Sequence, residues 1–124
     1  MVNTYYIGKL LDSDNSEEVE AGNAVGVFFP NQADRGTHIN VSGAGVTAHA
    51  PHAENAVKFL EFLSGEKAQK VFAQTNFEYP VKPGVEVAPL LASWGEFKSD
   101  DLNLSILGEK NSEAVMIFDQ AGWK

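Results

Sequence analysis

The chain of 124 residues contains no cysteine, which excludes disulfide bonds, thiolate metal sites and cysteine nucleophiles. Its longest apolar run, residues 25–30, has the length of a strand and falls far short of the roughly 20 residues of a membrane helix, so we expect no membrane insertion. Arginine occurs once, as Arg35, and the formal net charge is −8, which argues against nucleic acid as a partner. No nucleophile elbow or paired-carboxylate motif is present, so we predict that the chain is not an enzyme. Any metal site must use oxygen or imidazole ligands.

The periodicity of the apolar residues predicts a mixed α/β arrangement, with few strands and about four helices. Helices are expected at residues 3–11, 51–63, from 66 onward and 111–121, with weaker helical segments at 85–91 and from 105. Extended segments are expected at residues 25–29, 38–42, 46–50, 77–81 and 102–104, and a loop with at most one helical turn at 12–22. Two or three strands do not form a stable sheet alone, so we expect self-association to cover the unpaired strand edges.

The clearest amphipathic pattern lies after Pro51. Ala56, Phe59, Leu60 and Leu63 fall at i, i+3, i+4 and i+7, and a second apolar stripe follows the short link at residues 64–65. The pattern predicts a helical hairpin, and we expect its buried contacts to be Phe59, Leu60, Leu63 and Phe72. In such a packed core, Leu60→Ala would cost roughly 2–5 kcal/mol.

The strongest candidate for metal chemistry is the segment Asn3-Thr4-Tyr5-Tyr6 at the start of the first expected helix. A hard cation such as ferric ion prefers anionic oxygen donors, and a bound ion can displace a phenol proton. Two adjacent phenols can reach one ion only where the backbone departs from a regular helix, as it does at a helix start. The alternative is a simple pair of one core and one surface aromatic residue.

Three other groups offer weaker signals. His49 and His52 flank a proline and His38 lies on an expected strand, but no further ligand type accompanies them. Arg35 could hold an anion, although a surface turn is the plainer interpretation. The glycines of residues 42–45 do not form a phosphate loop and are predicted to allow close backbone packing.

The tyrosine pair resembles that of periplasmic ferric-ion-binding proteins, the substrate-binding components of bacterial iron(III) ABC transporters. The resemblance continues in order along the chain through VGVFFPNQ (25–32), RGTHINVSGAGV (35–46), EYPV (78–81), ASWGEFK (92–98) and IFDQAGW (117–123). It implies a periplasmic-binding-protein type II fold, Fe(3+) as ligand together with a synergistic anion, and an ABC permease as partner. It also implies that Tyr5 and Tyr6 are metal ligands, and that Asn3 and Thr4 bind the anion.

A complete protein of this family is more than twice as long, so the chain resembles its C-terminal part. By that resemblance, residues 1–32 and 87–124 belong to the second lobe and residues 36–84 to the first. A periplasmic location is implied, although the sequence shows no signal peptide. Because the remaining ligands of the family lie outside this chain, we expect weak or no ferric binding. The alternatives are an oligomeric structural or interaction module without iron, and a complete protein that uses the histidine pair for a divalent metal.

Overall fold

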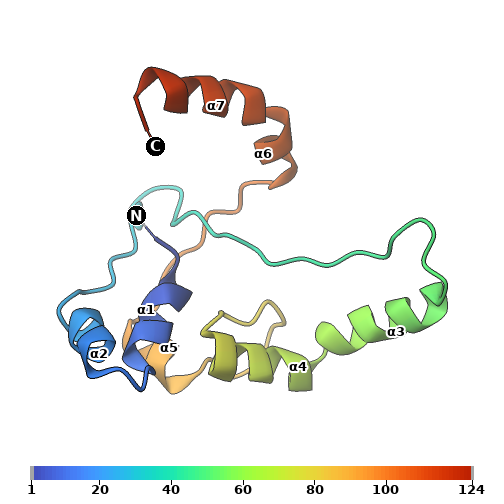
Figure 1. The fold of residues 1–124 in the computed structure, drawn as a ribbon, viewed down its shortest axis with the longest axis horizontal. Helices are drawn as coiled ribbons and strands as arrows, with labels where there is room; N and C mark the ends of the chain where they lie inside the picture. Colours follow the sequence, from blue (N-terminus) through green and yellow to red (C-terminus); the bar gives the residue numbers. More distant parts are fainter. Residues whose placement is uncertain (1, 124) are drawn as a thin grey trace. The chain divides into compact units, whose positions relative to one another are not determined.

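The computed structural model describes residues 2–123 (Figure 1). The regular elements of this part are helices: α1 (Thr4–Leu11), α2 (Ser16–Asn23), α3 (Ala53–Leu63), α4 (Glu66–Val71), the π-helical segment η1 (Phe72–Asn76), α5 (Pro89–Ser93), α6 (Ser105–Glu109) and α7 (Asn111–Gln120). They form two compact units, one from residues within 1–29 and 40–96, the other from residues within 30–39 and 97–124. No helix of this part is both long and apolar enough to span a membrane.

The predicted strands are not formed in the described part of the chain. Its one β-type pairing is an isolated parallel bridge between Thr37 and Ser99, and none of the segments predicted to be strands forms a regular strand there. The physical reason is that a strand exists only where a second segment satisfies its backbone N–H and C=O groups. The apolar sequence signal for these segments is real, but the expectation of strands within this chain alone is wrong.

The structure confirms the helices predicted at α1, α3, α4 and α7, but residues 12–22 are not the predicted loop. Helix α2 begins there at Ser16, because the side chain of Asn15 accepts a hydrogen bond of 3.0 Å from the Glu17 backbone N–H. Glu17 and Glu18 in the first turn further stabilise this helix, because their negative charges interact favourably with the partial positive charge of its N-terminus. The capping residue therefore outweighs the polar composition that predicted a loop.

The hydrophobic core of the first unit is small. Ala73 and Leu91 are fully buried, and Phe77 and Ala88 are nearly so. Partly buried side chains pack around this cluster, namely Tyr5, Tyr79, Val87, Leu90 and Trp94. The core therefore joins α1, η1 and α5, segments that are far apart in the sequence.

Gln69 fixes the segment around this core by two hydrogen bonds of opposite sense. Its Nε2 donates to the Leu63 carbonyl and its Oε1 accepts from the Val81 N–H, each at 2.9 Å. Because the side chain is 9% exposed, losing either partner would leave a buried polar group unsatisfied. The amide thus ties the end of α3 to the chain that follows η1.

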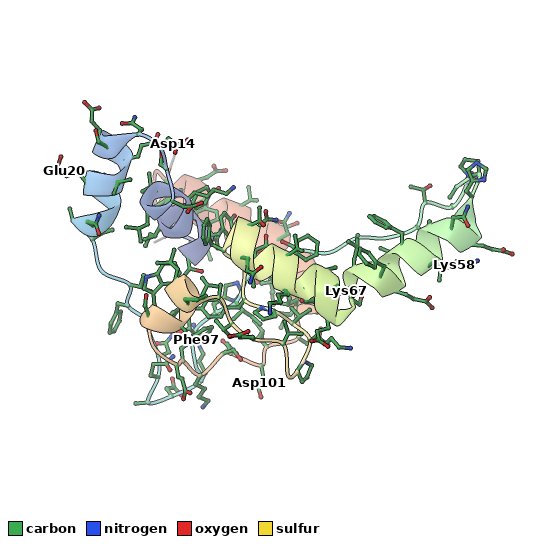
Figure 2. All side chains as sticks on the ribbon, turned by 90° about the horizontal axis from the view of Figure 1, so that it is seen from below. Asp14, Glu20, Lys58, Lys67, Phe97 and Asp101 are labelled. Atoms are coloured by element: carbon green, nitrogen blue, oxygen red, sulfur yellow. The ribbon has the colours of Figure 1, made fainter. Side chains whose placement is uncertain are left out.

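The expected hairpin contacts are not buried in this structure. Helix α3 has no buried residue; Phe59 is 57% exposed, and Leu60, Leu63 and Phe72 are only half-buried. The charged side chains Lys58 on α3 and Lys67 on α4 point away from their helices (Figure 2). The apolar stripe is thus present, but the described residues cover it only in part, so the predicted burial is wrong.

The second unit is held mainly by hydrogen bonds around the bridge at Thr37. The Thr37 N–H donates to Lys98 O and the Asp100 N–H donates to Thr37 O, both at 2.8 Å. Gln32 adds a second clamp, since its Nε2 donates to Lys98 O at 3.1 Å and its Oε1 accepts from Lys98 N at 2.7 Å. Two short extended segments are therefore joined without forming a sheet.

We predict that Leu91→Ala costs about 2–5 kcal/mol of unfolding free energy, because this side chain is fully buried. Leu60→Ala is the matched control and should cost clearly less, because its site is only half-buried. Urea unfolding of both variants measures the difference. Equal losses would show that the apolar face of α3 is covered in solution.

Candidate functional site

The two adjacent phenols lie at the start of α1, as the sequence predicts. The ring centroids of Tyr5 and Tyr6 are 4.6 Å apart, with 47° between the ring planes. Tyr5 is half-buried against the core, whereas Tyr6 is 53% exposed. The pair thus combines a fixed phenol with a solvent-facing one.

Asn3 occupies the N-cap position in an extended conformation, but its side chain makes no capping hydrogen bond. Its Nδ2 instead donates to the Tyr5 hydroxyl at 3.0 Å. Thr4 follows as the first residue of α1 and is half-buried. The predicted anion-binding residues therefore lie directly beside the phenols, and one of them already contacts a phenol.

The pKa of the Tyr6 phenol is raised above its ordinary value, first by its side-chain hydrogen bond with Tyr5. The unfavourable charge interaction between the two phenols and partial desolvation act in the same direction. Without a metal, Tyr6 is therefore protonated at neutral pH. A cation that binds it must displace this proton, so proton competition strengthens as the pH falls.

Two features around the pair were not singled out from the sequence. Lys9, one helical turn after Tyr5, places its Nζ 5.7 Å from the Tyr5 ring centroid. Gly8 is buried, and a Cβ atom there would lie 2.5 Å from the Phe77 side chain. A glycine inside a helical pattern was the available signal for this close approach.

Phe77 itself ends η1 with a left-handed backbone, at φ 57°. This conformation is unusual for an aromatic residue and turns its side chain toward α1, where it meets Gly8. The contact fixes α1 against the core and therefore determines the position of Tyr5.

The first turn of α1 contains no acidic residue. The partial positive charge of the helix N-terminus is therefore not neutralised within that turn, and it favours an anion beside the phenols. Two phenol oxygens and an adjacent anion form a donor set suited to a hard trivalent cation. They supply only part of the roughly six donors of an octahedral ion.

The weaker candidates do not assemble into a second site. His38, His49 and His52 are exposed, and the described residues contain no group of three or more histidine, cysteine or acidic side chains that could hold a metal. Arg35 pairs with the carboxylate of the buried Asp100 at 3.4 Å, so its partner among the described residues is a side-chain carboxylate. Open space surrounds the Cβ positions of Gly43 and Gly45, so the prediction of close backbone packing there is wrong.

Comparison with known proteins gives one consistent family. Residues 5–99 match the family described as bacterial extracellular solute-binding protein. "Iron uptake protein A1" of Synechocystis sp. is 52% identical over the whole chain, which covers 34% of that relative. "Fe(3+)-binding periplasmic protein" of Serratia marcescens is 26% identical over 88% of the chain, which covers 32% of that relative. The chain therefore spans about a third of the length of these curated relatives.

Solved structures agree. A Trichodesmium protein in complex with iron and citrate (IdiA, FutA) superposes with a TM-score of 0.94 at 46% identity, over 99% of this chain and 39% of that one. The ferric binding protein of Campylobacter jejuni gives a TM-score of 0.92 at 41% identity, over 100% of this chain and 39% of that one. The expected fold family is confirmed, and this chain represents part of that fold.

We predict that Gly8→Ala disturbs the candidate site through packing, because the new methyl group would overlap the Phe77 ring. The free energy of unfolding should fall by about 1–3 kcal/mol. Gly108→Ala is the control: its Cβ meets open space in α6, so it should be neutral or slightly stabilising. A Gly8→Ala variant as stable as the native chain would contradict the close contact.

Proposed function

Because the chain belongs to the family of bacterial extracellular solute-binding proteins, we propose that it is part of a ferric-ion-binding protein that serves an ABC transporter. The observation that carries this proposal is the Tyr5–Tyr6 pair at the start of α1, with ring centroids 4.6 Å apart. Support comes from relatives whose names specify iron uptake and ferric-ion binding, and from a structural neighbour in complex with iron and citrate. Binding, without catalysis, is the proposed activity.

In this proposal Tyr5 and Tyr6 each lose a phenol proton and ligate Fe(3+) as phenolates. Asn3 and Thr4 hold the synergistic anion at the helix N-terminus, where the amide of Asn3 has a second N–H beyond the one directed at Tyr5. Water or the anion fills the remaining positions. Two protein donors make an incomplete site, so ferric binding by this chain alone is weak.

The location and lobe assignment follow from the same family. We assign the chain to the periplasm, as the name of the Serratia relative states for that protein. Residues 1–32 and 87–124 correspond to the second lobe of the complete protein and residues 36–84 to the first. The chain is then the C-terminal part of such a protein, and the absent part supplies the other ligands.

Titration with ferric citrate tests the iron proposal. Ferric phenolates absorb visible light, so the chain should develop an orange-red band that weakens in Tyr5→Phe and in Tyr6→Phe and is lost in the double variant. Tyr79→Phe is the matched control, because the Tyr79 hydroxyl donates to Leu91 O at 3.2 Å within the core. Colour that survives loss of both phenols would place the metal elsewhere, and no colour at all would show that this chain alone does not bind ferric ion.

Exposed apolar surface favours a second property, self-association into a homo-oligomer. Helix α7 exposes four consecutive apolar residues, Val115, Met116, Ile117 and Phe118. Phe28, in a segment with an apolar strand pattern, is 85% exposed. Burying such surface is worth about 25 cal/mol per Å², so a second copy would cover what this chain leaves open. If iron binding is absent, this surface supports the alternative of an oligomeric structural or interaction module.

Sedimentation equilibrium at micromolar concentration should give a mass above the 13.4 kDa of one chain. Ile117→Lys places a charge within the apolar surface of α7 and should shift the distribution toward the monomer. Gln120→Lys makes the same charge change at the exposed end of α7 and serves as the charge-matched control. A single compact monomer of the native chain would overturn this part of the proposal.

A further inference from the structure

The two phenols of the candidate site are held very differently. Tyr5 packs against the core cluster, accepts a hydrogen bond from Asn3 and has Lys9 over its ring. Tyr6 is more than half exposed; its backbone N–H donates to Asn3 O, and its side chain lies against the Tyr5 ring and hydrogen-bonds with Tyr5. Tyr5 is therefore held by the core, Asn3 and Lys9, whereas the described side-chain contacts of Tyr6 are with Tyr5.

The side chain of Asn3 has an unusual role for its position. An asparagine at an N-cap ordinarily accepts a hydrogen bond from a backbone N–H of the first helical turn. Here it makes no such bond and donates from Nδ2 to the Tyr5 hydroxyl at 3.0 Å. The helix start is thus left without its side-chain cap, and the donor is directed at a phenol oxygen.

Such a donor has a specific consequence for ligation. A hydrogen bond to a phenol oxygen persists, and strengthens, when that oxygen carries negative charge. It also removes the rotational freedom that the phenol would otherwise lose on binding, which is the benefit of preorganisation. The side-chain hydrogen bond of Tyr6 is with Tyr5 itself, so Tyr6 must exchange this partner when the ion binds.

We propose that Asn3 is a positioning residue for Tyr5, so that Tyr5 is the preset ligand of the pair and Tyr6 is the ligand that moves onto the ion. This inference rests on the proposed ferric-ion binding and adds the order in which the two phenols engage. It assigns Asn3 a task separate from contact with the anion, because the two N–H groups of its amide serve different acceptors.

The first test uses the iron-free chain and the side-chain amide resonances of Asn3 in NMR. Tyr5→Phe removes the acceptor but keeps the ring, so these resonances should shift. Tyr79→Phe removes a hydroxyl from the same core and should leave them in place, since Tyr79 donates to Leu91 O. Asn3 resonances that do not respond to Tyr5→Phe would overturn the positioning role, whatever the chain does with iron.

The second test compares Asn3→Asp with Asn15→Asp, the same substitution at the cap of α2, in ferric citrate titrations. Aspartate keeps the shape and capping ability of asparagine but has no N–H donor at neutral pH. Its ferric affinity should fall about tenfold, the order expected for a lost hydrogen bond to a charged group. The charge-transfer band should move to longer wavelength, because an unsupported phenolate is a better electron donor. A merely structural change at a helix start would not move this band, and Asn15→Asp, the same change at the cap of α2, should leave its position unchanged.

Stopped-flow mixing separates the roles of the two phenols. Tyr5→Phe should slow the appearance of colour, whereas Tyr6→Phe should chiefly speed its loss when a chelator is added. Equal effects of the two substitutions, or an unchanged band and affinity in Asn3→Asp, would refute the inference while leaving ferric binding intact. Absence of any band in the native chain would instead refute ferric binding by this chain alone.

Discussion

The candidate site depends on one close contact, between the backbone of Gly8 in α1 and the side chain of Phe77. Phe77 adopts a left-handed conformation at the end of η1 and is nearly buried. Only a residue without a Cβ lets the ring lie this close to the helix. Because α1 rests on this ring, Tyr5 reaches the core cluster and the start of the helix is held in place. A packing constraint more than sixty residues away along the chain therefore determines where the first phenol stands.

Apolar patterns in this sequence are not matched by burial in the structure. Helices α3 and α7 carry apolar faces, yet α3 and α7 have no buried residue. The segments with strand patterns form no regular strand in the described part of the chain. The chain spans about a third of the length of its curated relatives, and the described residues leave these apolar faces largely exposed. Local structure forms where capping and helical hydrogen bonds suffice; strands and buried faces require partners.

The pair of tyrosines illustrates how neighbours in sequence become unequal in structure. Tyr5 and Tyr6 are chemically identical and adjacent, and each could be assigned to a metal from the resemblance alone. Successive helical residues point about 100° apart, so only one of them can face the core. Tyr5 packs against the core and its hydroxyl accepts a hydrogen bond from the Asn3 amide, whereas Tyr6 is exposed to solvent. The two phenols of the proposed ferric site are therefore held differently.

Several properties were readable from the sequence itself. Helical periodicity and terminal residues predicted α1, α3, α4 and α7 to within a few residues, and the Asn3–Tyr6 motif with its resemblance indicated the family and its ligand chemistry. Helix α2 was missed because one capping side chain, that of Asn15, outweighs a polar composition. The donor from Asn3 to Tyr5 and the approach of Gly8 to Phe77 were decided only by tertiary structure. Periodicity reports hydrogen bonds that close within a few residues, whereas contacts between distant segments depend on how a core closes, and no local pattern encodes that.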